Sequence, residues 1–160
     1  MDELTQNEIF LRKAVDLARL GSEEGHGGPF GAIVVKDGAV IGQGFNKVTT
    51  SNDPSAHAEI VAIREACKNL GNYQLTGCII YTSCEPCPMC LGAIYWARPD
   101  KVYFASTRFD AADAGFDDAL IYEEILVPAA QRTIPMILLP DDQAKAVFKE
   151  WKANPDKLSY

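Results

Sequence analysis

The sequence predicts an α/β fold of three layers, in which helices cover both faces of a central mixed sheet. Apolar runs of strand type alternate along the chain with helical runs, which is typical of α/β proteins. Asp37-Gly38 lies between two β-rich runs and predicts a hairpin. The other strands are separated by helices, and such crossovers usually join parallel neighbours. We therefore expect a five-stranded, mainly parallel sheet.

The first half of the chain is expected to supply a helix, the hairpin and a second helix. Apolar residues recur at helical spacing from Leu11 to Ala18 and predict an amphipathic helix over 6–24. Residues 25–31 are too rich in Gly and Pro for a helix interior, so we expect a loop. The elements that follow are strands over 32–36 and 40–45, a polar loop over 47–55, and a buried helix from about 56 to 69.

The second half is expected to continue with a strand, a cysteine-rich turn and further helices. Its elements are a strand over 78–83, a helix to about 97, a strand over 102–105, a last strand over 134–139 and a final helix to about 153. Asp141 is a suitable N-cap for the final helix. Residues 107–132 are the least regular stretch, and we expect the loop that closes over a ligand pocket to lie there.

Length and composition predict one domain over residues 1–160. Hydrophobic residues make up 48% of the chain, yet no apolar run approaches the roughly 18 residues of a membrane helix. The polar, acidic beginning of the sequence is unlike a secretory signal. We therefore expect a cytoplasmic protein whose five cysteines stay reduced, which favours a metal or catalytic role over disulfides.

The formal net charge of −7 argues against nucleic acid as a partner. A protein that grips DNA or tRNA usually presents a basic face to the phosphates. The few basic clusters here look like solvated helix faces. Charge can still be locally uneven, but a small-molecule substrate is the better expectation.

Three of the five cysteines lie within Ser83–Cys90, at the junction of an expected strand and helix. Cys87 and Cys90 are three residues apart, so both thiols face the same way, and the helix N-terminus favours thiolates. His57 opens the earlier buried helix and supplies a third ligand if the two helix N-termini are neighbours. Three protein ligands that leave a position for water are typical of a catalytic zinc site.

Glu59 follows His57 by two positions, so its carboxylate can move protons of a water held at such a site. Plainer interpretations remain for each of these residues. The two thiols could be core residues, Glu59 could be an ordinary charge at a helix N-terminus, and Cys84 could be a fourth ligand unless Glu85-Pro86 turns it away. We expect Cys67 and Cys78 to be packing thiols and His26 to be a loop residue near the pocket.

His-x-Glu followed by Pro-Cys-x-x-Cys is the pattern of zinc-dependent nucleobase deaminases. The chain resembles the cytidine-deaminase-like zinc deaminase superfamily and, within it, the guanine deaminases. The resemblance is carried by Gly28–Ala32, Asn46 with Val48–Pro54, His57–Glu59, Tyr81–Cys90, Ile94–Arg98, Ala114–Asp118 and Tyr160. The metal set alone defines only the superfamily, whereas the Gly-Phe-Asp-Asp segment and the last Tyr indicate guanine deaminase.

The resemblance implies a hydrolase of purine catabolism that converts guanine to xanthine and ammonia. It implies one zinc ion per subunit on His57, Cys87 and Cys90, with Glu59 passing protons to the base and then to the departing amine. The residues it implies for substrate contact are Asn46, Asp118, Tyr160, Phe30 and Trp96. It also implies a homodimer in which the C-terminal segments are exchanged, so that the last residues reach the partner's site.

These implied contacts have plainer interpretations when the sequence is considered alone. Phe30 and Trp96 could be core residues, Asp117 competes with Asp118, and a chain end such as Tyr160 is normally disordered. Other functions also stay open: deamination of cytosine, tRNA adenosine, an aminopurine or a triazine, or a binding module with structural zinc. Release of ammonia from a nucleobase would separate an enzyme from a binding module.

Overall fold

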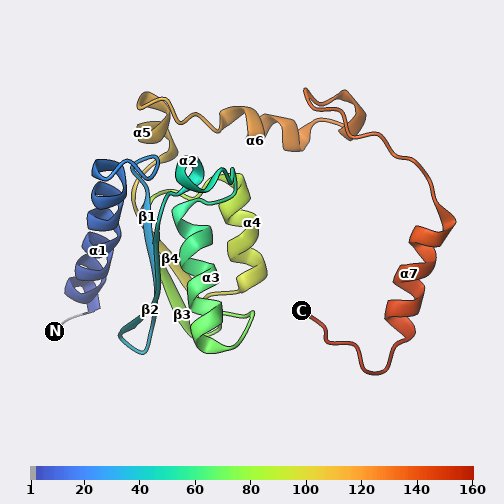
Figure 1. Ribbon diagram of the computed structural model, residues 1–160, viewed down its shortest axis with the longest axis horizontal. Helices are drawn as coiled ribbons and strands as arrows, with labels where there is room; N and C mark the ends of the chain where they lie inside the picture. Colours follow the sequence, from blue (N-terminus) through green and yellow to red (C-terminus); the bar gives the residue numbers. More distant parts are fainter. Residues whose placement is uncertain (1–2) are drawn as a thin grey trace. The chain divides into compact units, whose positions relative to one another are not determined.

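The structure is a computed structural model that describes residues 3–160, and the chain divides into two compact units, Met1–Asp118 and Ala119–Tyr160. The first unit contains α1 (Glu3–Glu23), β1 (Gly31–Lys36), β2 (Ala39–Phe45), α2 (Val48–Ser51), α3 (Ala58–Leu70), β3 (Cys78–Cys84), α4 (Pro88–Ala97), β4 (Lys101–Ser106) and α5 (Arg108–Asp113). The second contains α6 (Ala119–Leu126), a 3-10 turn at Ala129–Gln131 and α7 (Asp142–Ala153). Figure 1 labels these helices and strands.

The first unit is a three-layer α/β structure, as predicted. Ile33, Val35 and Tyr81 pack with Phe10 and Ala14 of α1 on one face of the sheet. The alternating neighbours on the strands point to the other face, where they build a second core with α3 and α4. Figure 1 shows α1 on one side of the sheet and α3 and α4 on the other.

The sheet is mixed, but the prediction of five mainly parallel strands is wrong. Among the described residues it has four strands, in the order β2-β1-β3-β4. β1 is antiparallel to both β2 and β3, and only β3 and β4 are a parallel pair. The α3 crossover does join two parallel strands, β2 and β3, but β1 lies between them and pairs with both.

Residues 134–139, predicted as the fifth strand, form no strand in the described structure. Their side chains are exposed, with Ile134 at 80% and Leu138 at 83%. A strand needs a partner for its backbone groups, and the unit that holds this segment contains only helices as regular elements. The apolar composition predicted a strand, but it could not indicate whether another strand lies beside the segment to pair with it.

The turns and caps largely follow the sequence signals. Asp37 and Gly38 both have positive φ, 50° and 77°, as a tight I′ hairpin requires. Gly71 ends α3 in the left-handed conformation, and Asp141 caps α7 by accepting a 2.7 Å hydrogen bond from the Gln143 backbone. The loop predicted over 47–55 contains the short helix α2. No helix of the described chain is both long and apolar enough to cross a membrane.

Candidate active site

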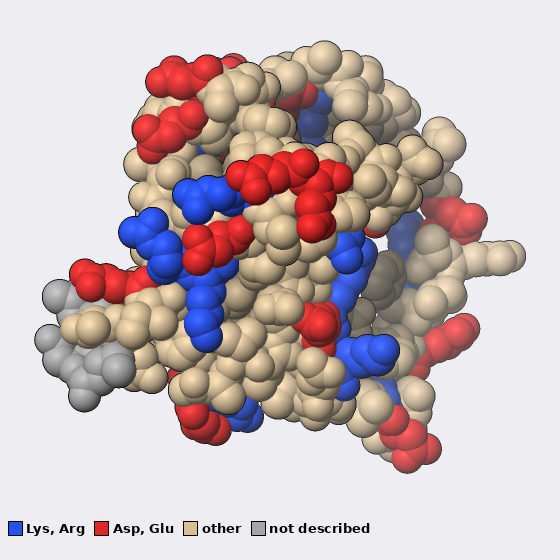
Figure 2. Space-filling view, turned by 60° about the vertical axis from the view of Figure 1, so that its left-hand side comes forward, with Lys and Arg blue, Asp and Glu red and all other residues tan. Residues whose placement is uncertain are grey.

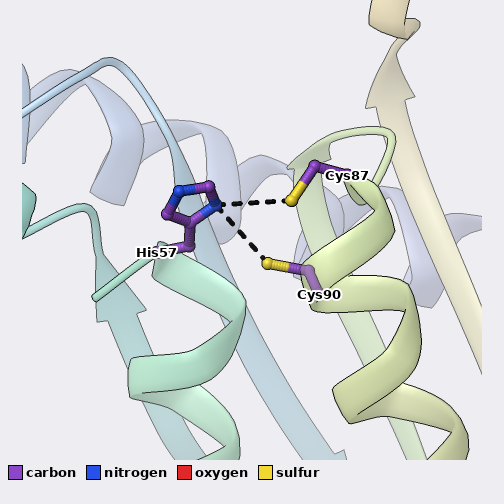
Figure 3. Close-up of side chains that lie close together, drawn as sticks. All are labelled: His57, Cys87 and Cys90. Atoms are coloured by element: carbon purple, nitrogen blue, oxygen red, sulfur yellow. Dashed lines mark hydrogen bonds between the residues drawn. The ribbon is translucent and has the colours of Figure 1, made fainter. Parts of the chain in front are cut away.

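The candidate metal ligands lie at the N-termini of α3 and α4. His57 and Cys87 are the N-cap residues of these helices, both in extended conformation, and Cys90 follows in the first turn of α4. An N-cap side chain ordinarily accepts a hydrogen bond from its own helix. Neither His57 nor Cys87 does so. Their side chains instead turn toward each other across the two helices (Figure 3).

The distances within this group fit one zinc ion. His57 Nδ1 lies 3.5 Å from Cys87 Sγ and 3.6 Å from Cys90 Sγ. In a tetrahedral site with Zn–N of about 2.0–2.1 Å and Zn–S of about 2.3 Å, nitrogen and sulfur are about 3.5–3.6 Å apart. All three donor atoms lie within 4.8 Å of one another. The chain therefore offers a soft two-thiolate, one-imidazole set already spaced for zinc.

The two thiols differ in their electrostatics. Hydrogen bonds from Cys90 and then His57 lower the pKa of Cys87 to about 4. The hydrogen bond that Cys90 makes with Cys87, together with burial, raises the pKa of Cys90. The hydrogen bond with Cys87 raises the pKa of His57. Cys87 is thus the thiol of the group that loses its proton more readily, and binding of a cation would favour deprotonation of Cys90 and His57 as well.

Glu59 lies in the first turn of α3, next to the metal group. Only 6% of the residue is exposed, and its carboxyl is hydrogen-bonded with the Cys90 thiol. Burial raises the pKa of this carboxyl. Because Glu59 is buried, the interpretation of its carboxyl as an ordinary solvent-exposed charge at a helix N-terminus does not fit the structure. The carboxyl can, however, exchange protons with a molecule held at the metal.

The other cysteines and His26 have different partners. The Cys84 thiol, only 7% exposed, donates to the Thr107 carbonyl at 3.5 Å, and burial raises its pKa to about 11. Burial likewise raises the pKa of Cys67 and of Cys78. The ring of His26 lies 5.0 Å from that of Phe45, and its Nε2 is 3.2 Å from Glu24.

Three of the five predicted substrate contacts lie in one neighbourhood of the first unit. The Asn46 backbone N–H donates to the Phe30 carbonyl at 3.0 Å, and Asn46 is buried. The Phe30 ring meets Phe116 edge-on, with centroids 5.0 Å apart. Asp118 follows two residues later. Its pKa is raised first by burial and then by the charge of Cys87. The Asp118 carboxyl therefore lies within electrostatic range of the metal group.

The remaining two predicted contacts are placed differently. Trp96 lies near the C-terminal end of α4 and is 65% exposed. Tyr160 belongs to the second unit and is 71% exposed. Each is an exposed aromatic side chain, and each stays a prediction as a substrate contact.

Sequence reasoning gave no role to Gly27, Gly28 and Phe116, although they shape this neighbourhood. A Cβ on Gly27 would lie 2.2 Å from the side-chain oxygen of Asn46, and one on Gly28 would lie 3.0 Å from the Phe116 ring. The Gly-Gly pair before Pro29 was the signal available in the sequence. It predicted a loop, but only the structure identifies the side chains that come so close to that loop.

The fold and this site together define a zinc deaminase. Residues 4–106 match the family described as the cytidine and deoxycytidylate deaminase zinc-binding region, and the chain belongs to that family.

Comparison with individual members of the family shows how fully this chain resembles each of them. The chain is 58% identical over 154 residues to guanine deaminase of Bacillus subtilis strain 168, an alignment that covers 96% of this chain and 99% of that one. An X-ray structure of guanine deaminase from Bacillus subtilis superimposes with a TM-score of 0.94 at 57% identity, covering 100% and 99% of the two chains. The tRNA-specific adenosine deaminase of the same strain is 40% identical over 103 residues, which cover 64% of this chain and 63% of that protein.

Proposed function

We propose that this protein is a zinc-dependent guanine deaminase that hydrolyses guanine to xanthine and ammonia. The observation that carries the proposal is the group of His57, Cys87 and Cys90, spaced for zinc, with the buried carboxyl of Glu59 on Cys90. It occurs in a chain that matches a guanine deaminase over nearly its whole length. Both the chemistry and the substrate class follow from this combination.

Zinc bound by two thiolates and one imidazole would lower the pKa of a water ligand to about 7 and so supply hydroxide at neutral pH. Glu59 takes one proton of the attacking water and delivers it to N3 of guanine while the oxygen adds to C2. The second proton of the water passes through Glu59 to the amine at C2. The C2–N bond then breaks, ammonia leaves and the oxygen stays on xanthine.

The proposal assigns base recognition to Asn46, Asp118, Phe30, Trp96 and Tyr160. Guanine offers N–H donors at N1 and N9 and acceptors at O6 and N7. A carboxylate such as Asp118 accepts from an N–H, whereas a carboxamide such as Asn46 both donates and accepts. Phe30 and Trp96 supply apolar faces for the ring. The common neighbourhood of Phe30, Asn46 and Asp118 supports the first three assignments.

The proposal includes a homodimer in which the C-terminal segments are exchanged and Tyr160 reaches the partner's site. The two edges of the sheet support this part. At the β2 edge, the Gln43 backbone N–H donates to Glu65 at 2.6 Å, and Asn69 donates to the Ile41 carbonyl at 2.9 Å, so helix α3 covers it. β4 is the other edge strand, and most of its residues are exposed. An exposed edge strand of this kind can pair with an added strand. Residues 134–139 are an apolar segment that could supply that strand from the second copy.

The rest of the proposal concerns the cell. Cytosol keeps thiols reduced, as the metal group requires, and all five cysteines are free in the described structure. We place the enzyme there, in the breakdown of purines.

Deamination of tRNA adenosine is a second candidate because of the likeness to tRNA-specific adenosine deaminases. A net charge of −7 disfavours it. On the face drawn in Figure 2, Lys and Arg are interspersed with Asp and Glu rather than gathered into one broad basic patch. Guanine deaminase thus remains the better proposal.

A substrate panel tests these candidates. Ammonia release is measured from guanine, 8-azaguanine, adenine, cytosine, ammeline and a tRNA substrate with the zinc-loaded protein. Guanine is expected to be turned over best. Release from tRNA adenosine alone would favour the second candidate, and release from none, with zinc bound, would indicate a binding module.

A further inference from the structure

The carboxamide of Asn46 has a fixed orientation. Its Oδ1 accepts a 3.1 Å hydrogen bond from the Val48 backbone N–H. A backbone N–H can only donate, so the side-chain atom that faces it has to be the oxygen and not the amide nitrogen. Within the described part of the chain, no other hydrogen bond engages this carboxamide. Its NH₂ group is therefore available as a donor.

Gly27 makes the room in which this carboxamide lies. A Cβ at position 27 would lie 2.2 Å from Asn46 Oδ1 and 2.7 Å from the Asn46 carbonyl oxygen. Real Cβ atoms do not approach oxygen so closely, so a side chain here would displace Asn46 or the loop. The next residue back is held as well, because the hydroxyls of Thr49 and Thr50 donate to the His26 carbonyl at 3.0 and 3.1 Å. The loop therefore cannot move away freely.

We propose that Gly27 is a positioning residue for base recognition. It holds the Asn46 carboxamide with its oxygen on the Val48 N–H and its NH₂ group free to donate to an acceptor of the purine ring. The proposal rests on the proposed guanine deaminase activity and deepens it, since it assigns Asn46 the part of donor. On guanine that donor would serve O6 or N7.

A double-mutant cycle tests whether Gly27 acts through Asn46. Gly27→Ala should lower kcat/KM for guanine about 10- to 100-fold, mainly through KM, as expected for loss of one buried hydrogen bond. In an Asn46→Ala background the same change should cost less than about threefold, because the recognition it disturbs is already gone. An equal loss in both backgrounds would overturn the proposal. Gly92→Ala is the matched control, because a Cβ at position 92 meets no atom within 4 Å.

Asn46→Asp tests the orientation without touching the glycine, and so serves even if Gly27→Ala does not fold. A carboxylate still accepts from the Val48 N–H but has no hydrogen to give. It should lose guanine turnover as Asn46→Ala does, and full activity would overturn the proposal. Substrate analogues identify the acceptor. If it is O6, Asn46→Asp should not lower turnover of 2-aminopurine, which lacks O6. If it is N7, the substitution should not lower turnover of 7-deazaguanine, which lacks N7.

Zinc content and turnover by the unsubstituted protein separate this proposal from the one it rests on. An unsubstituted protein that binds zinc and releases no ammonia from guanine contradicts the proposed function. An active unsubstituted protein whose Gly27→Ala variant matches it in KM and kcat contradicts only the positioning role.

Discussion

The two units of the chain differ in how they bury their apolar residues. The first unit has a core on each face of its sheet, and residues such as Ala14, Val34 and Leu75 are fully buried. The helices of the second unit contain no buried residue, and Leu126 and Leu139 are more than 80% exposed. The first unit is organised by its own packing, whereas the second has apolar surface that calls for a cover.

This difference also separates the two halves of the proposed site. The proposed zinc ligands, Glu59 and Asn46 all belong to the first unit, so its fold alone brings them together. Tyr160 lies in the second unit, and the proposed exchange would give it to the partner. Chemistry and part of base recognition would then depend on different chains.

The largest expected effect comes from removing a zinc ligand in the first unit. Cys87→Ala should leave less than one zinc per chain and reduce guanine deamination to background, since two protein ligands hold zinc poorly. Metal analysis and an ammonia assay measure both. Cys67→Ala, a thiol outside the metal group, is the control and should keep zinc and activity. A zinc-replete, active Cys87→Ala variant would show that the ligand set is wrong.

Glu59→Gln should separate the chemistry from the metal. Loss of a proton-transferring carboxylate is expected to lower kcat about 10²- to 10⁴-fold, while zinc stays bound. Glu65→Gln makes the same change on the same helix, and the amide oxygen can still accept from the Gln43 N–H. It should be as active as the unsubstituted enzyme. A Glu59→Gln enzyme with normal kcat would remove Glu59 from the mechanism.

Tyr160→Ala should lower kcat/KM for guanine about tenfold, as expected for loss of one contact to the base. Co-expression with Glu59→Gln tests which chain provides that contact. In an exchanged dimer, half of the sites in mixed dimers combine an intact Glu59 with a Tyr160 from the partner. Activity should therefore recover to about a quarter of the unsubstituted enzyme's. Without exchange it should stay below that of the Tyr160→Ala protein alone.

The smallest expected effect concerns stability. Leu75→Ala, in the first core, should cost about 2–5 kcal/mol in denaturant unfolding. Leu138 is 83% exposed in the single chain. If it stays uncovered in solution, Leu138→Ala should leave the free energy of unfolding almost unchanged. If a second copy covers it, Leu138→Ala should cost about 1 kcal/mol and shift the dimer toward monomer in light scattering. No change in either measurement would count against exchange.

The sequence predicted what depends on local pattern. His57 and Cys87 were predicted to lie at the starts of two helices. Together with Cys90, three positions after Cys87, they indicated a zinc centre, and Glu59, two positions after His57, indicated a proton-transferring group beside it. The Asp37-Gly38 turn and the three layers also followed from local signals.

The features that were missed depend on contacts between distant segments. β1 lies between β2 and β3, and this position makes two of the three strand pairs antiparallel. No local sequence pattern indicates the order of strands in a sheet. Residues 134–139 have strand-like composition, but their own unit, Ala119–Tyr160, contains no strand with which they could pair. The close approach of Gly27 to Asn46 joins two loops 19 positions apart along the sequence.

The central claim is that zinc on this site deaminates guanine, and metal removal tests it most directly. Chelator-treated protein should not convert guanine to xanthine. One equivalent of zinc per chain should restore equal amounts of xanthine and ammonia, but should not restore turnover in the Glu59→Gln variant. Turnover of guanine by the metal-free protein, or none by the zinc-loaded one, would contradict the account.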